Sequence, residues 1–307
     1  MRHLHSLDSL SLSRSWLTIG NFDGVHRGHQ HLIHRLVEGA HREDALAVVL
    51  TFHPHPDVVL RGISSPYALS TPDERAALLG ALGVDIVITY PFTPALAAQP
   101  GESFLARLKH HLGFTRLWVG YDFAMGRQRD TDIHRLHDLQ TRYTFQLEVQ
   151  RAIAFEGQVI SSTWTRSLLA EGNVRRARRA LGRPYTLRGA VVPGDARGRT
   201  IGVPTANVQP PPEKVIPARG VYACRVLVDG IPFRAATNIG VRPTFDGASL
   251  QQTVETHLLD FQGNLYGQEI EVQFLERLRG EKRFASVHHL VEQIRQDLTL
   301  VREVVPL

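Results

Sequence analysis

The first half of the chain alternates short apolar runs with amphipathic segments. Residues 15–19, 45–52, 84–90 and 116–120 are apolar runs with the length of buried strands. Between them, residues 27–42, 72–82 and 102–112 carry apolar side chains at helical spacing, and Thr71 is placed to cap the second of these helices. This alternation predicts an α/β, Rossmann-like domain with a parallel sheet covered by helices.

The second half of the chain has a different pattern. Helical spacing ends near residues 181–185, and short β-rich runs follow, separated by Gly, Pro and Asp, at 185–192, 221–228, 233–239, 253–259 and 269–275. Regularly spaced strands of this kind predict a small antiparallel β-barrel, closed by a helix at 287–300. We therefore expect two unlike domains, residues 1–182 and 183–307, without an internal repeat.

Composition narrows the class of protein. The 307 residues are 43% hydrophobic, and Cys224 is the only cysteine, so no intrachain disulfide can form and the thiol is interpreted as a core residue. No apolar run has the length of a membrane span, and the first sixteen residues lack the apolar core of a signal peptide. We expect a cytoplasmic protein without membrane association.

The formal charge of +5 suits a nucleic-acid-binding protein or an enzyme of polyphosphate substrates. The dense basic cluster lacks interleaved aromatic residues for base stacking, which favours a solvated helix face; it consists of Arg175, Arg176, Arg178, Arg179 and Arg183. We expect no nucleic-acid partner. The alternative predicts strongly salt-dependent binding of oligonucleotides. The pattern gives no indication of oligomeric state.

A candidate phosphate site follows the first apolar run. Residues 20–29 read Gly-Asn-Phe-Asp-Gly-Val-His-Arg-Gly-His, and the histidines fall at the start of the expected helix. Free N–H groups and the helix dipole favour an anion there. His26 and His29 project from one face of the first turn, Gly28 leaves room for a bulky anion, and Gly20 and Gly24 permit a tight turn.

Two other interpretations of these histidines exist. They could only cap the helix, or they could bind a metal together with His53 and His55, which lie in Thr-Phe-His-Pro-His-Pro at 51–56. The glycines favour an extended polyanion over a compact ion. The prolines predict a stiff, extended loop at 51–56.

At residues 160–166, Ile-Ser-Ser-Thr-Trp-Thr-Arg, hydroxyl groups begin a helix and Arg166 follows one turn later. Taken alone the segment could be only a capped helix, but together with the histidine motif upstream it is expected to form a second phosphate clamp. A third candidate lies in the second half, at residues 194–207. Its glycines allow backbone amides to approach phosphates, and Thr205 and Asn207 offer neutral oxygens to Mg²⁺. Farther on, Glu255 lies in an apolar strand, where its carboxylate can accept the proton of an attacking hydroxyl.

These motifs together resemble the prokaryotic bifunctional riboflavin kinase/FAD synthetase family. The likeness rests on residues 20–29, 160–166 and the Pro-Thr-Ala-Asn at 204–207, and it continues through 238–245, 254–261 and 279–284. It implies phosphorylation of riboflavin to FMN in the C-terminal barrel and adenylylation of FMN to FAD, with release of pyrophosphate, in the N-terminal domain. ATP and Mg²⁺ are the implied co-substrate and cofactor, and riboflavin, FMN and FAD the implied small-molecule partners.

The resemblance also implies roles for single residues. Glu255 would be the base of the kinase, with Mg²⁺ on Thr205 and Asn207, and His26, His29 and Arg166 would act in adenylyl transfer. The remaining implied residues bind ATP phosphates (Gly20, Asn21, Phe22, Gly24, Gly28, Ser162, Thr163, Gly198, Gly202) or flavin (Phe52, Pro54, His55, Asp122, Phe123, Arg242).

The chain departs from the family pattern around the expected N-terminal flavin pocket. Met125 stands where phenylalanine is usual, Gln128 and Thr131 replace glycines, Thr165 replaces a branched apolar residue, and His53 occupies a commonly acidic position. A runner-up function is therefore a nucleotidyltransferase of different acceptor specificity whose barrel only binds flavin. An inactive kinase site would favour it.

Overall fold

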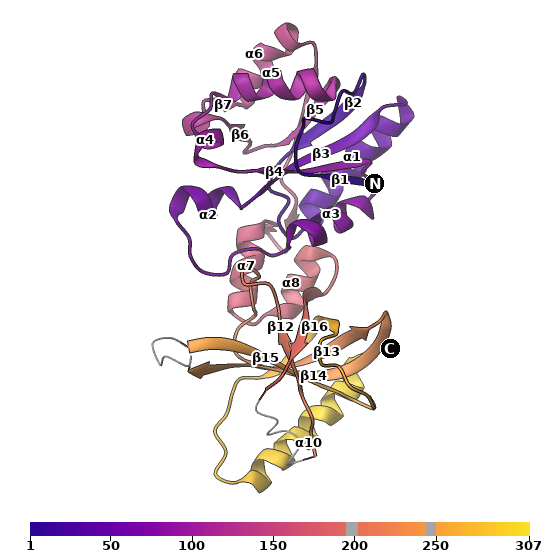
Figure 1. Ribbon diagram of the computed structural model, residues 1–307, viewed down its shortest axis with the longest axis vertical. Helices are drawn as coiled ribbons and strands as arrows, with labels where there is room; N and C mark the ends of the chain where they lie inside the picture. Colours follow the sequence, from indigo (N-terminus) through magenta and orange to yellow (C-terminus); the bar gives the residue numbers. More distant parts are fainter. Residues whose placement is uncertain (195–201, 244–249) are drawn as a thin grey trace. The chain divides into compact units, whose positions relative to one another are not determined.

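The computed structural model describes residues 1–194, 202–243 and 250–307. Its contacts divide the chain into two units, Met1–Ser162 and Thr163–Leu307. Figure 1 shows the course of the chain through both. Gly198 and the other residues of 195–201, as well as residues 244–249, lie outside the described part.

The first unit contains a parallel sheet. Its strands lie in the order β1 (Arg2–Leu4), β4 (Ile86–Pro91), β3 (Leu46–His53), β2 (Ser15–Ile19), β5 (Phe114–Gly120) and β8 (Gln146–Gln150), each parallel to its neighbours. The chain builds outward from β2 in two directions, first to β3 and β4, then to β5 and β8. Open α/β sheets bind their ligands at such a switch point, beyond the carboxyl ends of the strands.

Helices cover both faces of this sheet (Figure 1). On one face, α5 (Gly101–Leu112) and α6 (Ile133–Tyr143) share an apolar core with Leu17, Leu50 and Leu117. On the other, α1 (Arg27–Arg42) and α3 (Pro72–Gly80) pack with strand residues such as Trp16 and Val49. Strand side chains alternate between the faces, so burial of both faces explains the unbroken apolar runs of the sequence.

The expected strands and helices of this half are confirmed, with ends shifted by a few residues. Thr71 caps α3 in a full capping box with Glu74. The sequence did not indicate β1, α6 and β8, nor the short elements α2 (Pro56–Arg61), α4 (Pro94–Ala97), β6 (Ala124–Met125), the 3₁₀ turn at Arg127–Arg129, β7 (Thr131–Asp132), β9 (Ala154–Phe155) and β10 (Gln158–Val159).

The prediction of an extended loop at residues 51–56 is wrong at both ends. Strand β3 continues to His53, and the peptide bond between His53 and Pro54 is cis. His55 caps α2, because its Nδ1 accepts a hydrogen bond from Asp57 N at 3.1 Å. Pro56 then fills the first helical position, where the N–H that proline lacks would have no helical partner.

The second unit contains a closed antiparallel barrel. Its strands follow the order β11 (Tyr185–Val192), β12 (Ala206–Gln209), β15 (Leu250–Leu258), β14 (Ile231–Pro243), β13 (Gly220–Val228) and β16 (Glu269–Arg279). Helix α10 (Val287–Val304) packs Val301 against Ala223 and Leu275, and its Asp297 pairs with Arg279 at 2.8 Å. The barrel and its closing helix are as expected, except that β12 occupies the end of a segment interpreted as a loop.

Two helices precede the barrel, α7 (Ser162–Ala170) and α8 (Val174–Leu181). Apart from Ser162 they belong to the second unit, and α8 contacts β16 and β11. The division by contacts therefore lies ahead of residue 182, and the expected boundary at 182/183 stays a prediction. On α8, Arg175, Arg178 and Arg179 are exposed, as a solvated helix face requires.

Cys224 lies on β13 and is fully buried in the barrel. Burial raises the pKa of its thiol to about 12. Its interpretation as a core residue is confirmed.

Candidate active sites

The glycine- and histidine-containing loop begins at the carboxyl end of β2, at the switch point of the parallel sheet. Gly20 N still donates to Leu50 O of β3 at 3.1 Å, and the chain then turns into α1. The segments that begin at Pro54 and Tyr121 leave the same edge, because β3 and β5 run parallel to β2 on its two sides. The fold thus brings the expected nucleotide loop and the expected flavin loops to one edge.

His26 and His29 form a stacked pair at the N-terminus of α1. Their ring centroids are 3.6 Å apart with an interplanar angle of 20°, and Phe22 meets the His29 ring edge-on at 5.0 Å. His26 is also the helix cap, because its Nδ1 accepts the N–H of His29 at 3.3 Å. The capping interpretation is therefore correct for His26, but it does not account for His29.

The His29 side chain carries a buried nitrogen whose hydrogen-bonding capacity is unused. Within the described residues, Nδ1 of His29 has no hydrogen-bond partner. Burial, and next to it the charges of His26 and Arg75, hold the pKa of His29 well below its usual value of 6.5. A neutral imidazole with an unused polar atom at a helix N-terminus is suited to hydrogen-bond an anionic ligand.

Of the three glycines of the loop, Gly24 acts as expected, whereas Gly28 and Gly20 make room for aromatic rings. A Cβ atom on Gly28 would lie 3.1 Å from the His26 ring, so Gly28 makes room for that ring and not directly for an anion. A Cβ on Gly20 would likewise lie 3.1 Å from the Phe22 ring. Gly24 has a φ of +76°, in the left-handed region that a tight turn needs.

Non-glycine residues of this loop also adopt left-handed backbone angles. Phe22 has a φ of 47° and Val25 one of 40°, and both side chains are buried. This region is strongly disfavoured for a β-branched residue, and such angles persist where surrounding contacts enforce them. The loop is therefore held in a defined, strained conformation.

Asp23 supplies one of these contacts, and sequence reasoning missed it. Its carboxylate is fully buried and accepts the N–H groups of Leu69 and Ser70 at 3.0 Å and the hydroxyl of Ser70 at 3.2 Å. The same hydroxyl accepts Gly24 N at 2.9 Å. Asp23 stands in the quoted motif between Phe22 and Gly24, but its partners lie 46 and 47 residues away, so the sequence could not show them.

Arg75 on α3 is the second residue that holds the loop, and no pattern in the sequence indicated this role. It is 2% exposed, and its Nη1 donates to Asn21 O at 2.9 Å. Asn21 O also accepts the hydroxyl of Thr51, at the end of β3, at 2.8 Å. The buried donors of Arg75 and Thr51 thus fix the backbone of the expected nucleotide loop.

The expected phosphate clamp at 160–166 is brought to this loop in part. Ser162 Oγ donates to Asp23 O at 2.8 Å, and Ile160 O would lie 3.8 Å from a Cβ on Gly28. Helix α7 begins at Ser162, as expected. Thr163 and Arg166 belong to the second unit, so their participation in the site stays a prediction.

The expected flavin residues lie along the same sheet edge. Phe52 and Phe123 are partly buried against the core of the α5/α6 face. His55 packs edge-on against Tyr67 at 5.0 Å, next to the cis-linked Pro54. Asp122 is exposed, and its backbone O accepts Arg129 Nη2 at 2.8 Å. Their contact with flavin stays a prediction.

Two departures from the family pattern have structural consequences. Gln128 has a φ of 53°, which explains why a glycine suits this position. Thr131 is 2% exposed, and a Cβ on Gly101 would lie 2.5 Å from its hydroxyl oxygen. Gly101 therefore accommodates the side chain that replaces a glycine at 131.

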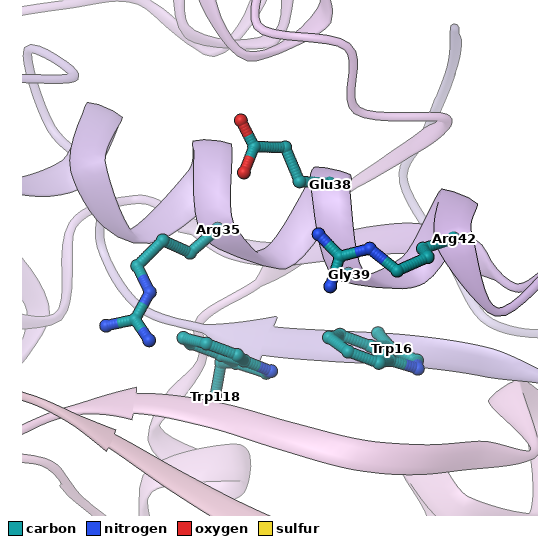
Figure 2. A pocket seen from close by; sticks show the side chains of 6 residues that line it. All are labelled: Trp16, Arg35, Glu38, Gly39, Arg42 and Trp118. Atoms are coloured by element: carbon teal, nitrogen blue, oxygen red, sulfur yellow. The ribbon is translucent and has the colours of Figure 1, made fainter.

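A separate pocket of about 250 Å³ lies along the C-terminal half of α1 (Figure 2). Trp16 and Trp118 stack at its floor with ring centroids 6.1 Å apart, and Arg35 lies 5.3 Å from the Trp118 ring. Gly39 lets α1 rest on Trp16, since a Cβ there would lie 2.1 Å from the indole. None of the predicted site residues that the structure describes lines this pocket.

In the barrel, Glu255 lies in a row of polar side chains. In the strand register it faces Asn207 of β12 on one side and Asn238 of β14 on the other. Side chains directly opposite each other in a ladder have Cβ atoms about 4.5–5.5 Å apart. The adjacent Thr237 and Thr256 are fully buried and 3.1 Å apart, so the row lies on the outer face of the barrel.

Two other segments of the expected kinase motifs approach this row. A Cβ on Gly194 would lie 2.1 Å from Asn207 Nδ2, so this glycine makes room for the asparagine. A Cβ on Gly240 would lie 3.0 Å from Glu281 Oε1 and 3.3 Å from Asn238 Nδ2. Asn238 and Glu281 fall in quoted motifs, but the sequence alone did not show that they neighbour the expected base.

The remaining predicted kinase residues are described only in part. Thr205 directly precedes β12 and is half-buried, and Gly202 is exposed with a φ of +77°. Arg242 lies on β14 opposite Gln251, and its side chain is outside the described part. Gly198 is also outside it. The roles of all four stay predictions.

A transition-metal site is not indicated. In the described ranges 1–194, 202–243 and 250–307, no three His, Cys, Asp or Glu side chains come together as metal ligands. Mg²⁺ makes a different demand, since it binds through one or two protein oxygens, substrate phosphates and water. The amide oxygen of Asn207 beside the Glu255 carboxylate fits this requirement.

Both halves of the chain match known families. A family model described as FAD synthetase matches residues 9–164, and one described as riboflavin kinase matches residues 181–305. The curated protein named bifunctional riboflavin kinase/FMN adenylyltransferase from Escherichia coli strain K12 is 39% identical over 305 residues, which is 99% of this chain and 96% of that protein. The protein of the same name from Bacillus subtilis strain 168 is 33% identical over 297 residues, 96% and 94% of the two chains.

A solved structure has the same fold over its whole length. A crystal structure described as a macrolide-efflux protein from Streptococcus pneumoniae superimposes with a TM-score of 0.88 and 30% sequence identity, covering 98% of each chain. In the part of the chain that the structure describes, every helix is too short or too polar to cross a membrane.

Proposed function

The chain belongs to the bifunctional riboflavin kinase/FMN adenylyltransferase family, and from this membership we propose which residues carry its two reactions. It phosphorylates riboflavin to FMN with its C-terminal riboflavin kinase domain. With its N-terminal FAD synthetase domain it transfers the adenylyl group of ATP to FMN, which gives FAD and pyrophosphate. The exact boundary between the two catalytic domains is proposed at 182/183.

For adenylyl transfer, the stacked His26/His29 pair at the N-terminus of α1 is the observation that carries the assignment. A phosphate oxygen of FMN attacks the α-phosphorus of ATP, and the bond to pyrophosphate breaks. FMN is already anionic, so a strong general base is unnecessary. Neutral His29 would donate from its imidazole to the phosphates, beside the free N–H groups of the helix, and Arg166 would neutralise the charge that builds on them.

The other N-terminal roles follow from the sheet edge. The loop from Gly20 to Gly28 and the hydroxyls of Ser162 and Thr163 would hold the ATP phosphates. The flavin would lie against the residues that follow β3 and β5, namely Phe52, Pro54, His55, Asp122 and Phe123. The common origin of these segments at one edge of a parallel sheet supports this arrangement.

For the kinase, the row Asn207–Glu255–Asn238 supports the assignment. Glu255 would accept the proton of the riboflavin 5′-hydroxyl as its oxygen attacks the γ-phosphorus of ATP and ADP leaves. Thr205 and Asn207 would hold Mg²⁺, which when bound neutralises phosphate charge. Gly198 and Gly202 would approach the phosphates through their backbone, and Arg242 would contact the flavin.

We further propose that the enzyme works in the cytoplasm, with riboflavin, FMN, FAD and ATP as its small-molecule partners and without a nucleic-acid or membrane partner. The absence of a nucleic-acid partner is supported by α8, where Arg175, Arg178 and Arg179 form an exposed helix face and Arg175 pairs with Glu276. Anisotropy titrations with a labelled oligonucleotide at two salt concentrations test it. Tight, salt-dependent binding would contradict the absence of a nucleic-acid partner.

The decisive test follows flavin products over time. Purified protein is incubated with riboflavin, ATP and Mg²⁺, and the flavins are separated by chromatography. We expect FMN first and FAD after it, and no product when EDTA replaces Mg²⁺. FMN without FAD would mean that the N-terminal site takes a different acceptor. Absence of both products would overturn the residue assignments of both sites.

A further inference from the structure

Arg75 connects the two sides of the N-terminal site through one buried planar group. Its Nη1 donates to Asn21 O at 2.9 Å, to Thr51 Oγ1 at 2.7 Å and to Phe52 O at 3.0 Å. Its Nη2 lies 3.4 Å from Ser70 O. Asn21 belongs to the expected ATP loop, and Phe52 to the expected flavin side. A single side chain therefore spans the loop after β2 and the end of β3.

The chemistry of arginine suits this task. The guanidinium is planar, permanently charged and carries its N–H donors in a rigid fork, whereas lysine presents a point charge on a flexible stem. Backbone carbonyls that share one guanidinium keep a fixed separation. Because Asn21 O of the loop and Phe52 O of β3 both accept from Nη1, while Nη2 lies 3.4 Å from Ser70 O, the orientation of the guanidinium determines how far apart the loop and the end of β3 lie.

We propose that Arg75 is a positioning residue for adenylyl transfer, which fixes the distance between the ATP-binding loop and the flavin-binding end of β3. The inference rests on the proposed assignment of His26, His29 and Phe52 to that reaction. Arg75 lies behind these residues and is not required to touch either substrate. The nucleophilic oxygen and the α-phosphorus must be held about 3–3.5 Å apart and in line, and a misplacement of about 1 Å can cost about 100-fold in rate.

The position of Arg75 also affects His29. The Arg75 charge acts together with burial and with His26 to lower the pKa of His29. Arg75 therefore influences both the position of the loop and the protonation state of the histidine proposed to meet the phosphates. This gives the positioning role a spectroscopic readout that a purely structural arginine elsewhere in the core would not have.

The experiment compares Arg75→Met and Arg75→Lys with a control in the same helix. Leu79→Ala removes a fully buried apolar side chain from α3 and destabilises the unit, but it removes none of the hydrogen bonds that hold the loop. FAD formation from supplied FMN gives kcat and KM, and FMN formation from riboflavin in the barrel domain serves as an internal control. The pKa of His29 is measured by NMR titration of labelled histidines, with assignment by His29→Ala.

We expect Arg75→Met to lower kcat of FAD formation by about 100-fold at a temperature where the variant is folded. FMN formation should be unchanged, and the pKa of His29 should rise. Arg75→Lys keeps the charge but not the fork, so the pKa of His29 should stay low while kcat recovers only in part. Leu79→Ala, compared at the same folded fraction, should retain nearly full kcat.

Three results would overturn the inference. Arg75→Met could retain its kcat, Arg75→Lys could restore kcat completely, or Leu79→Ala could lose as much activity as Arg75→Met. If Arg75→Met does not fold, Arg75→Lys and Thr51→Val, which removes one acceptor, still test it. Failure of the proposed site itself gives a different result. If His29→Ala retains FAD formation, the assignment of the site is wrong. If His29→Ala is inactive but Arg75→Met is active, only the role of Arg75 is refuted.

Discussion

The two candidate sites of this enzyme are held in place by different kinds of contact. In the first unit, buried hydrogen bonds fix a strained loop: Arg75 donates to its backbone at Asn21 O, and the carboxylate of Asp23 within it accepts the N–H groups of Leu69 and Ser70. In the barrel, Glu255 and its neighbours are placed by the backbone ladder of β12, β15 and β14. One site depends on individual side chains and the other on strand register.

This difference has a consequence for mutations. A ladder keeps its geometry when a side chain on it changes, because the backbone hydrogen bonds remain. A loop that is fixed through a carboxylate and a guanidinium loses its conformation when either group is removed. Substitutions outside the reacting groups should therefore impair the N-terminal site far more often than the barrel site.

The largest effect is expected when the proposed base of the barrel is removed. Glu255→Gln should lower kcat of riboflavin phosphorylation by about 10²–10⁴-fold, since loss of a general base costs this much. FAD formation from supplied FMN should be unchanged, because the other site is separate. Parallel assays of the two half-reactions check this. Loss of both activities in a folded variant would contradict two independent sites.

The matching substitution in the first unit is His29→Ala. FAD formation should fall by about 10²–10³-fold, as expected for removal of one donor to a developing charge, while FMN formation persists. His34→Ala provides the control, because His34 is exposed on the same helix. A small loss in His29→Ala, or an equal loss in both variants, would reject His29 as a phosphate-binding group.

The comparison of loop and ladder is tested most directly by Asp23→Asn and Asn238→Ala. The carboxylate of Asp23 accepts hydrogen bonds from backbone N–H groups, and the NH₂ group of an asparagine cannot replace an accepting oxygen. We therefore expect the first unit to lose about 1–3 kcal/mol in its free energy of unfolding. Asn238→Ala should cost the barrel less than about 1 kcal/mol. Hydrogen exchange measured peptide by peptide reports each unit separately. Equal costs would refute the distinction.

Low pH should lower the free energy of unfolding of the first unit through protonation of His29. Its pKa is lowered in the folded state, so the unfolded chain binds the proton first as the pH falls below 6.5. The contribution of neutral His29 to the free energy of unfolding is complete above pH 6.5. It declines below this pH, with a slope of at most about 1.4 kcal/mol per pH unit for one proton. Unfolding of the first unit, measured between pH 7.5 and 5, should show this slope, and His29→Ala should reduce it.

The smallest effects concern the two replaced glycines. Gln128→Gly should stabilise the first unit by up to about 1 kcal/mol, because it relieves a left-handed φ of 53°. Thr131→Gly should destabilise it, because it leaves a void against Gly101. Thermal unfolding of the two variants checks the signs. If both variants shift the unfolding temperature in the same direction, backbone conformation and packing do not explain the effect of these two residues on stability.

The sequence determined the local features of both sites. The β2 strand, the helix that starts after His26, the cap at Thr71 and five of the six barrel strands, all but β12, follow from side chains near each other in the chain, and the structure confirms them. The motifs also indicated the family, which the comparisons confirm. Short-range periodicity, capping and turn chemistry suffice for these features.

Which distant residues meet depends on how the elements pack in three dimensions. Asp23 and Ser70 lie 47 positions apart, and Arg75 and Asn21 lie 54 apart, so no local pattern connects them. The order of strands in the sheet places the loops after β2, β3 and β5 at one edge, and the barrel register places Asn238 beside Glu255. Pairing of this kind depends on how whole elements pack, because buried polar groups take whichever partners the assembled fold brings within reach.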